Sequence, residues 1–418
     1  MNVESFRPNT ALPFEDECRQ ALQGLRQALI EAFGEVQVDP ARPRQAARDL
    51  GVDKNLAWRV SKIVSQPDVF QVVGNIPHQA GVKILCKAFR DAGAQEETLG
   101  RVSTSHAAFE GLVERHAGDR ATFELVVGGL ARGDAQGAAL EQARKLAFRG
   151  NAAVWSVQSR VQVSTAFMAP SPDDPEMVDV VHIFGQVDLR RYRTDVRWIL
   201  SRTSVFDDKE LSVRGVDGHA LDNGHSNGNA GVVPPLIHEF STQPFPTLDV
   251  EDLGHERRFV LPEGPVGRTG ELTALFGLVH PALGPRHAQG GDRFCQMISV
   301  CLTPAEHLHF DLFVHDELGW ESTPRAAVVG RLDGEGYNLG SERHANELPF
   351  TEQVLDLGHG IAGAATPRMP WYASLVEHVF ERLGWDPQAF RASRFEMAYP
   401  PMPAQVILYT DLPEAPGA

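Results

Sequence analysis

Apolar residues recur at helical spacing through the first 150 residues of this 418-residue chain. Over 14–33 they form one stripe, acidic residues crowd the first turn, and Gly34 is placed to end the helix. The pattern also predicts two short helices within 43–65, with no β-hairpin after them. Further helices are predicted over 77–93, 104–116, 119–131 and 136–150. This part of the chain is therefore predicted to be all-α.

The pattern changes near residue 152. The run 154–169 is compatible with the continuation of a helix, whereas the later apolar runs are short and typical of strands. A last helix is predicted over 371–384, and the end of the chain predicts a hairpin in which RFEMAY and AQVILYT flank the turn PPMP. The strand candidates before it are VDVVHIFGQVDL, VRWILSRTSVF, RRFVLPEG, ELTALFGLVH, FCQMISVCL and HLHFDLFVH.

These elements predict a multidomain α+β protein. An all-α region over 1–150 is expected to precede an acidic α+β domain over 151–418 with antiparallel strands. The segment 214–235 is rich in Gly, Asn, Asp and His, which predicts a flexible loop or linker and offers a second point of division. The topology of the second domain is left open by the pattern.

The charge of the chain is shared unevenly between the two regions. The net charge is −16, yet residues 1–150 hold 19 basic and 19 acidic residues. Subtraction from the totals of 39 and 55 leaves 20 basic and 36 acidic residues beyond residue 150. The negative excess, which repels nucleic acid, is therefore confined to the second region.

Cysteine usage and the start of the chain indicate the compartment. The four cysteines show no C-x-x-C spacing, which argues against structural zinc and against a disulfide framework. The first residues are polar and acidic, without a secretory signal, and no apolar run is long enough for a membrane helix. We therefore expect a cytoplasmic protein with no membrane partner.

The stretch QAARDLGVDKNLAWRVSKIV carries the features of two helices joined by a tight turn. Ala47 is a small residue at the helix contact, Gly51 allows a left-handed turn, and Asp53 is a plausible N-cap for a second helix from Lys54. The inner stripe of that helix is predicted to comprise Leu56, Ala57, Val60 and Ile63, with Leu50 and Val52 beside the glycine.

This stretch resembles the helix-turn-helix of bacterial transcription regulators, in which A-x-x-x-G is followed by an apolar anchor six residues later. The resemblance is limited to about 43–65 and implies docking of the second helix in the major groove of DNA. Between Ala41 and Lys62 six basic and two acidic residues give a local net charge of +4. The groove-facing residues would be Lys54, Asn55, Trp58, Arg59 and Lys62, with Arg42, Arg44 and Arg48 on phosphates.

Individual base contacts follow from side-chain chemistry. Arg59 is suited to guanine and Asn55 to adenine through paired hydrogen bonds. Ala57 is smaller than the usual apolar anchor, and Trp58 stands where a polar residue is expected. The alternative interpretation is a helical hairpin packed in the N-terminal bundle, whose outer face is solvated or binds a protein partner.

The strand HLHFDLFVH is the second candidate for chemistry. Alternation places His307, His309, Asp311 and His315 on one face, where His307 and His309 could share a metal ion. The alternative is a half-buried strand whose polar face lies in solvent, because Phe313 interrupts that face and no further ligand set completes a site. Leu308, Phe310, Leu312 and Val314 would form the core face.

Two further observations limit the functional classes. The arginines between 190 and 202 are expected to neutralise carboxylates across an interface. The chain lacks the phosphate-loop, H-E-x-x-H, G-x-S-x-G and G-x-G-x-x-G motifs, so no cofactor or catalytic residue is predicted. We expect a DNA-binding transcriptional regulator whose acidic domain oligomerises or senses an unknown effector. A protein-interaction module and a metal-dependent enzyme are the alternatives.

Overall fold

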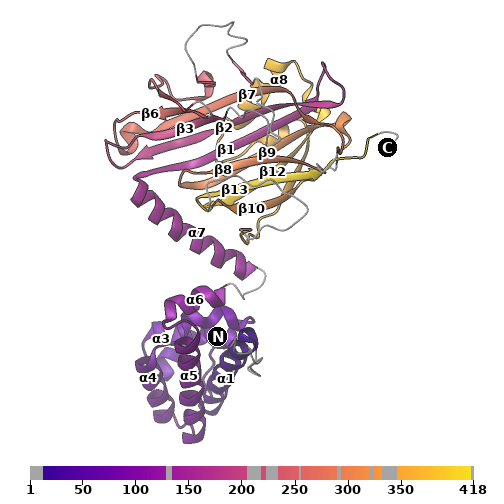
Figure 1. Ribbon diagram of the computed structural model, residues 1–418. Helices are drawn as coiled ribbons and strands as arrows, with labels where there is room; N and C mark the ends of the chain where they lie inside the picture. Colours follow the sequence, from indigo (N-terminus) through magenta and orange to yellow (C-terminus); the bar gives the residue numbers. More distant parts are fainter. Residues whose placement is uncertain are drawn as a thin grey trace, which may run out of the picture. The chain divides into compact units, whose positions relative to one another are not determined.

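The computed structural model divides into two compact units, Met1–Leu140 and Glu141–Ala418, close to the division predicted at residue 150 (Figure 1). Each unit is described by itself. Most of the predicted loop over 214–235 lies outside the residues that the structure describes. Those residues are 13–128, 134–204, 218–222, 234–253, 256–289, 293–320, 323–331 and 346–415.

The first unit is helical, as predicted. Its long helices begin with acidic turns, such as Glu15 to Glu17 of the first, which suits the helix dipole. The helices are α1 (Phe14–Glu35), α2 (Pro43–Asp49), α3 (Lys54–Ser65), η1 (Val69–Asn75, a 3₁₀ helix), α4 (Gln79–Asp91), α5 (Glu96–His116) and α6 (Arg120–Gly128).

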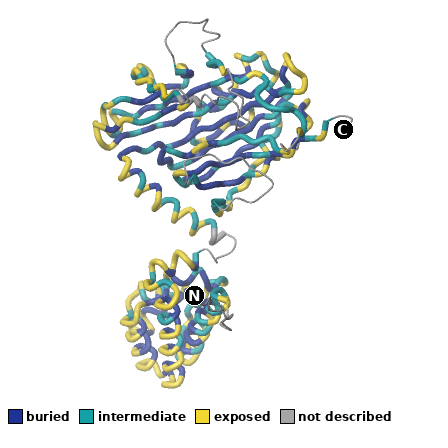
Figure 2. Tube along the Cα trace, in the orientation of Figure 1, coloured by how far each residue is buried: buried dark blue, intermediate teal, exposed yellow. Residues whose placement is uncertain are grey.

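One apolar core holds these helices together. The stripe predicted on α1, from Cys18 to Phe33, is buried, and so are the inner residues of α3. Edge-to-face aromatic pairs connect the longer helices: Phe33 and Phe89 at 5.0 Å, and Phe109 and Phe123 at 5.7 Å between ring centroids. The core thus buries the inner sides of α2 and α3, and Figure 2 shows both buried and exposed positions along the helices of this unit.

The turn between α2 and α3 forms as the local sequence predicts. Gly51 has a φ of 62°, and its N–H donates to the carbonyl of Arg48 while the next N–H, of Val52, donates to Ala47. This pair of hydrogen bonds is the Schellman motif that ends a helix at a left-handed glycine. The Asp53 carboxylate then accepts from the N–H of Asn55 at 2.8 Å and caps α3.

The second unit is built on a seven-stranded mixed sheet with the strand order β11-β12-β9-β1-β2-β7-β4. β1 and β9 run parallel, and their neighbours are antiparallel. The long helix α7 (Asp134–Trp155) precedes β1. The strands of this sheet are β1 (Val157–Pro170), β2 (Met177–Arg191), β4 (His219–Ala220), β7 (Leu272–Pro285), β9 (Ala305–His315), β11 (Leu355–His359) and β12 (Phe390–Ala398).

Both faces of the large sheet are covered. One face packs against α8 (Tyr372–Leu383), and the other packs against a three-stranded sheet of β10 (Arg325–Gly330), β13 (Ala404–Asp411) and β8 (Phe294–Cys301). A third sheet joins β3 (Trp198–Ser204), β6 (Glu256–Leu261) and β5 (Asp249–Asp252) and packs by Leu200 and Leu261 on β2 and β7. The α+β class is therefore confirmed.

Two predicted elements are wrong. The run 154–169 is compatible with the continuation of a helix, but α7 ends at Trp155 and residues 157–169 lie in strand β1, which is mostly buried on both faces and therefore shows no alternation. The terminal hairpin does not form, because β12 lies in the seven-stranded sheet and β13 in the β8–β10 sheet. Tyr399, with a φ of 51°, and the prolines at 400, 401 and 403 separate the two strands, and the chain changes layer there.

Candidate functional site

The predicted DNA-contacting residues lie on one exposed surface formed by α2 and α3. We call it the basic face and define it by Arg44, Arg48, Lys54, Asn55, Trp58, Arg59 and Lys62. All of these except Arg59 are exposed, whereas Ala57, Val60 and Ile63 on the opposite side of α3 are at most 3% exposed. The inner and outer sides of α3 are therefore those predicted from the sequence.

The cations of the basic face differ from the other cations of the first unit. Among the residues that the structure describes, no carboxylate lies within ion-pair distance of Arg44, Arg48, Lys54 or Lys62. Arg42, by contrast, pairs with Asp39 at 3.5 Å. Elsewhere in the unit, most basic residues also pair with carboxylates, as in Arg19–Glu15, Lys87–Asp91, Arg90–Glu96, Arg101–Glu31, Arg115–Glu17 and Arg120–Glu110. The basic face thus keeps an uncompensated positive charge.

Arg59 lies at the edge of this face and is half-buried. Its Nη2 donates to the carbonyls of Gly74 at 3.1 Å and Ile76 at 3.4 Å, which lie at the end of η1. Both contacts use the same nitrogen. The guanidinium therefore fixes the η1 segment against α3, and this engagement of Nη2 suits a single contact to a phosphate better than the paired contact to guanine.

Trp58 is the only aromatic residue of the basic face and is 49% exposed. The Lys62 ammonium lies 5.7 Å from the centroid of its ring, within cation–π range. Lys54 is one turn before Trp58 on the same side of α3. The indole is therefore flanked by two cations along the helix.

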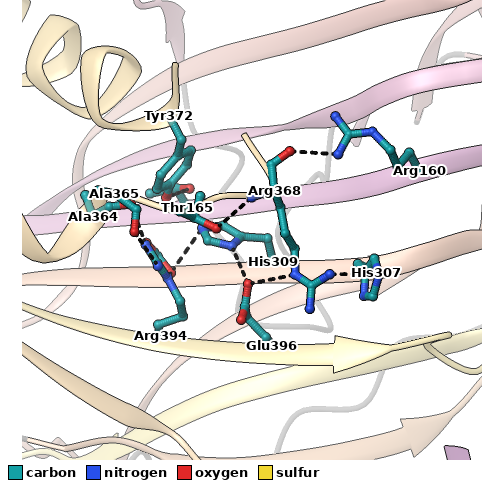
Figure 3. Close-up of polar contacts among 12 residues, drawn as sticks. Arg160, Thr165, His307, His309, Ala364, Ala365, Arg368, Tyr372, Arg394 and Glu396 are labelled. Atoms are coloured by element: carbon teal, nitrogen blue, oxygen red, sulfur yellow. Dashed lines mark hydrogen bonds and ion pairs between the residues drawn. The ribbon is translucent and has the colours of Figure 1, made fainter. Parts of the chain in front are cut away.

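The second candidate, on β9, is a buried polar cluster beneath α8 (Figure 3). Asp311 accepts two hydrogen bonds of 2.8 Å from Arg394 of β12, and Arg394 also donates to the Ala364 carbonyl at 2.8 Å. His309 lies beside Asp311, and the hydroxyl of Tyr372 is 2.7 Å from that of Thr165. His309 and Asp311 are both fully buried, so the predicted solvent-exposed polar face of this strand is wrong.

His309 lies between two carboxylates. Its Nδ1 is 3.2 Å from Glu396 Oε1, and its Nε2 is 3.4 Å from Asp311 Oδ1. Burial is the largest single effect and disfavours the imidazolium, but the charge of Asp311 and the hydrogen bonds to Asp311 and Glu396 together outweigh it and raise the pKa of His309. The pKa of Glu396 is lowered by its hydrogen bond to His309, and the pKa of Asp311 is lowered by His309 and Arg394 despite its burial.

His307 is separated from this group by Arg368. The Arg368 Nη1 donates to His307 Nε2 at 2.9 Å, and its Nε lies 3.4 Å from Glu396. Burial, with the charge of Arg368, lowers the pKa of His307 to about 4. The Nε2 of the neutral His307 already accepts a hydrogen bond from the Arg368 guanidinium. Its lone pair is therefore in use, so this nitrogen does not serve as a metal ligand.

The metal hypothesis therefore gains no support from the geometry. Within the described ranges, no three His, Cys, Asp or Glu side chains are grouped so as to hold a metal ion. The guanidinium of Arg394 already pairs with Asp311, and that of Arg368 lies 3.4 Å from Glu396, so each carboxylate already has a cationic partner. The cluster is a structural network that joins β9 and β12 to the segment before α8.

Local sequence patterns do not indicate the partners in this cluster. Arg394 and Glu396 lie more than 80 residues beyond His309, in the predicted hairpin, and Tyr372 opens the helix that covers them. Their only local signal is the spacing of Arg394 and Glu396, which places both on the same side of a strand. In the arginine run, Arg190 pairs with Glu271 and Arg197 with Asp249, so carboxylates are neutralised as expected, but these partners belong to the same unit and do not lie across an interface between units.

Acidification should destabilise the second unit through His307 and His182, whose pKa burial also lowers to about 4. Both are neutral in the fold, so the unfolded chain binds more protons between about pH 6.5 and 4, and stability falls as the pH falls through that window. The raised pKa of His309 has the opposite effect, because its contribution to stability is lost as the pH rises. The loss should be smaller in His307→Gln, as measured by urea denaturation at pH 7 and pH 5; equal losses in both proteins would contradict this account.

Comparison of the chain with known protein families, curated proteins and solved structures finds no match. Among the helices of the described ranges, none combines the length and apolar character needed to cross a membrane. The function is therefore inferred from the chemistry of the two candidate sites.

Proposed function

We propose that this chain is a DNA-binding transcriptional regulator that docks through the basic face. The observation that carries the proposal is the exposed group of cations on α2 and α3, for which the described part of the chain offers no carboxylate partner. Lys and Arg side chains that neutralise phosphates release counterions, and this supplies most of the non-specific affinity for DNA. An α-helix presented by a short preceding helix fits the major groove in width.

The roles within the face follow from position and exposure. Arg44 and Arg48 on α2 are placed for backbone phosphates, and Lys54, Asn55, Trp58 and Lys62 on α3 for the groove. Arg59 would contact a phosphate while it holds η1. The acidic region beyond residue 150 would be repelled by the duplex, which orients docking towards the basic face.

The second unit would oligomerise or sense an effector, and the protein would act as a homo-oligomer in the cytoplasm. A symmetric dimer places two such helices one turn of DNA apart, about 34 Å, so that each reads a half-site. Light scattering tests this directly. A particle of twice the 45.8 kDa chain mass supports the dimer, and a monomer that stays monomeric on DNA contradicts it.

A mobility-shift assay at low salt with genomic DNA fragments tests the proposed function. The double variant Arg44→Ala/Lys62→Ala should bind about tenfold to 100-fold more weakly than the wild type, because it removes two positive charges of the basic face, one placed for a phosphate and one for the groove. The matched control is Lys83→Ala/Lys87→Ala on α4, which removes the same charge outside the basic face. Equal binding by the two double variants, or no binding by the wild type, would contradict the proposal.

The alternative function is the binding of a protein partner through the same helices, and the mobility-shift assay distinguishes it from DNA binding. In that case DNA is not shifted by any form of the protein. The exposed indole of Trp58 would then be the centre of a protein interface, and Trp58→Ala would lose a partner in a pull-down.

A further inference from the structure

Trp58 is the one apolar side chain of the basic face, and phosphate attraction does not explain its presence there. Among the described residues of the first unit, Phe33, Phe89, Phe109 and Phe123 are at most 2% exposed, and Phe14 is partly buried against the same core. The inner side of α3 at this turn is filled by Ala57. The indole of Trp58 lies on the solvent side of α3, and the residue is 49% exposed. This apolar surface favours contact with another apolar group.

The surroundings of the ring limit what that group can be. Lys54 and Lys62 lie four residues before and after Trp58, about 6 Å away along the helix axis on each side. Lys62 contacts the ring, and Asn55 lies one turn away on the same side. An apolar groove on a protein would have to desolvate the two lysine charges beside the indole, which is costly. A groove with an apolar floor and anionic walls accommodates both the ring and the two cations.

We propose that Trp58 contacts the C5-methyl group of thymine in the major groove, which makes A·T base pairs the preferred site of α3. This inference rests on the proposed function. The thymine methyl is the apolar group that base pairs present in the major groove, and the indole offers it a flat apolar surface. Asn55 is suited to the N6 and N7 atoms of adenine, so both side chains select the same kind of base pair.

Removal of the methyl group from the DNA tests the inference. Two duplexes of equal length, one of alternating dA and dT and one of alternating dA and dU, have the same charge and differ in the C5-methyl groups. The full-length wild type should bind the dT duplex about fourfold more tightly for each methyl group that the indole buries. Fluorescence anisotropy at constant low salt measures both affinities.

The variants separate the methyl contact from general DNA affinity. Trp58→Ala should bind the two duplexes equally, Trp58→Phe should keep part of the preference, and Lys54→Ala should weaken both duplexes to the same extent. Leu125→Ala, which truncates an exposed apolar residue of α6, is the matched control and should behave like the wild type. Because Trp58 is exposed, we expect all of these variants to fold, and circular dichroism verifies it.

Three results would overturn the inference, and they are distinguishable from one another. If the wild type binds both duplexes equally, DNA binding stands and the methyl contact is wrong. If Trp58→Ala keeps the preference for dT, another residue reads the methyl group. If single-stranded dT competes better than the duplex, the ring stacks on unpaired bases instead. Failure to bind any DNA removes the proposed function itself.

Discussion

Asp311→Ala should lower the free energy of unfolding of the second unit by about 3–5 kcal/mol. The substitution leaves Arg394, buried beneath α8, without the carboxylate that accepts both of its 2.8 Å hydrogen bonds. It also removes the charge that raises the pKa of His309, so a second buried group loses its partner. Breaking one half of a buried ion pair is costly because the remaining charge stays desolvated.

Urea denaturation followed by tryptophan fluorescence measures this effect for the second unit alone. In a Trp58→Phe background the remaining five tryptophans, at 155, 198, 320, 371 and 385, all lie beyond residue 140. Removing both partners in Asp311→Leu/Arg394→Met should restore most of the loss. Asp411→Ala, which breaks the half-exposed pair with Arg325, should cost at most about 1 kcal/mol. A similar small loss in Asp311→Ala would show that the cluster does not stabilise the fold.

Reversal of two charges on the basic face should abolish DNA binding. Lys54→Glu/Lys62→Glu places carboxylates on both sides of Trp58, inside a groove walled by phosphates, and like charges at an interface cost several kcal/mol. The affinity at low salt should therefore fall by about 100-fold or more. Anisotropy titration with a duplex measures it.

The matched control for that reversal is Lys83→Glu/Lys87→Glu on α4, which changes the net charge by the same amount at a site away from the basic face. It should lose affinity only through the weaker long-range field, which salt screens. If both reversals weaken binding equally, attraction to the net charge of the unit is responsible and α3 has no special role.

The α2–α3 turn can be predicted from the sequence because every signal in it is local. Ala47, Gly51 and Asp53 act within a few residues of one another, and the helix bounds and the inner stripe follow from them. The outer side can be predicted in the same way, since burial of Val60 and Ile63 fixes which residues face solvent. The contact of Arg59 with the end of η1, 15 residues later, cannot be predicted from these local signals.

The second unit is harder to predict because its decisive contacts are distant along the chain. Alternation in β9 separates Leu308 and Phe310 from His309 and Asp311 correctly. It does not say that α8, more than 50 residues later, covers the polar side. The final hairpin is expected from two apolar runs around a turn, yet those runs belong to different layers. The local pattern of apolar and polar residues shows that a segment is a strand and which side chains share a face. It does not show which other strands or helices pack against it.

The salt dependence of DNA affinity tests the central claim most directly. For the wild type, the logarithm of the association constant should fall linearly with the logarithm of the salt concentration, by roughly 0.9 per phosphate that the protein neutralises. In the variant in which Arg44, Arg48, Lys54 and Lys62 are all alanine, the slope should be smaller by roughly 0.9 for each phosphate that is no longer neutralised. Wild type and variant falling on lines of the same slope would contradict DNA binding through the basic face.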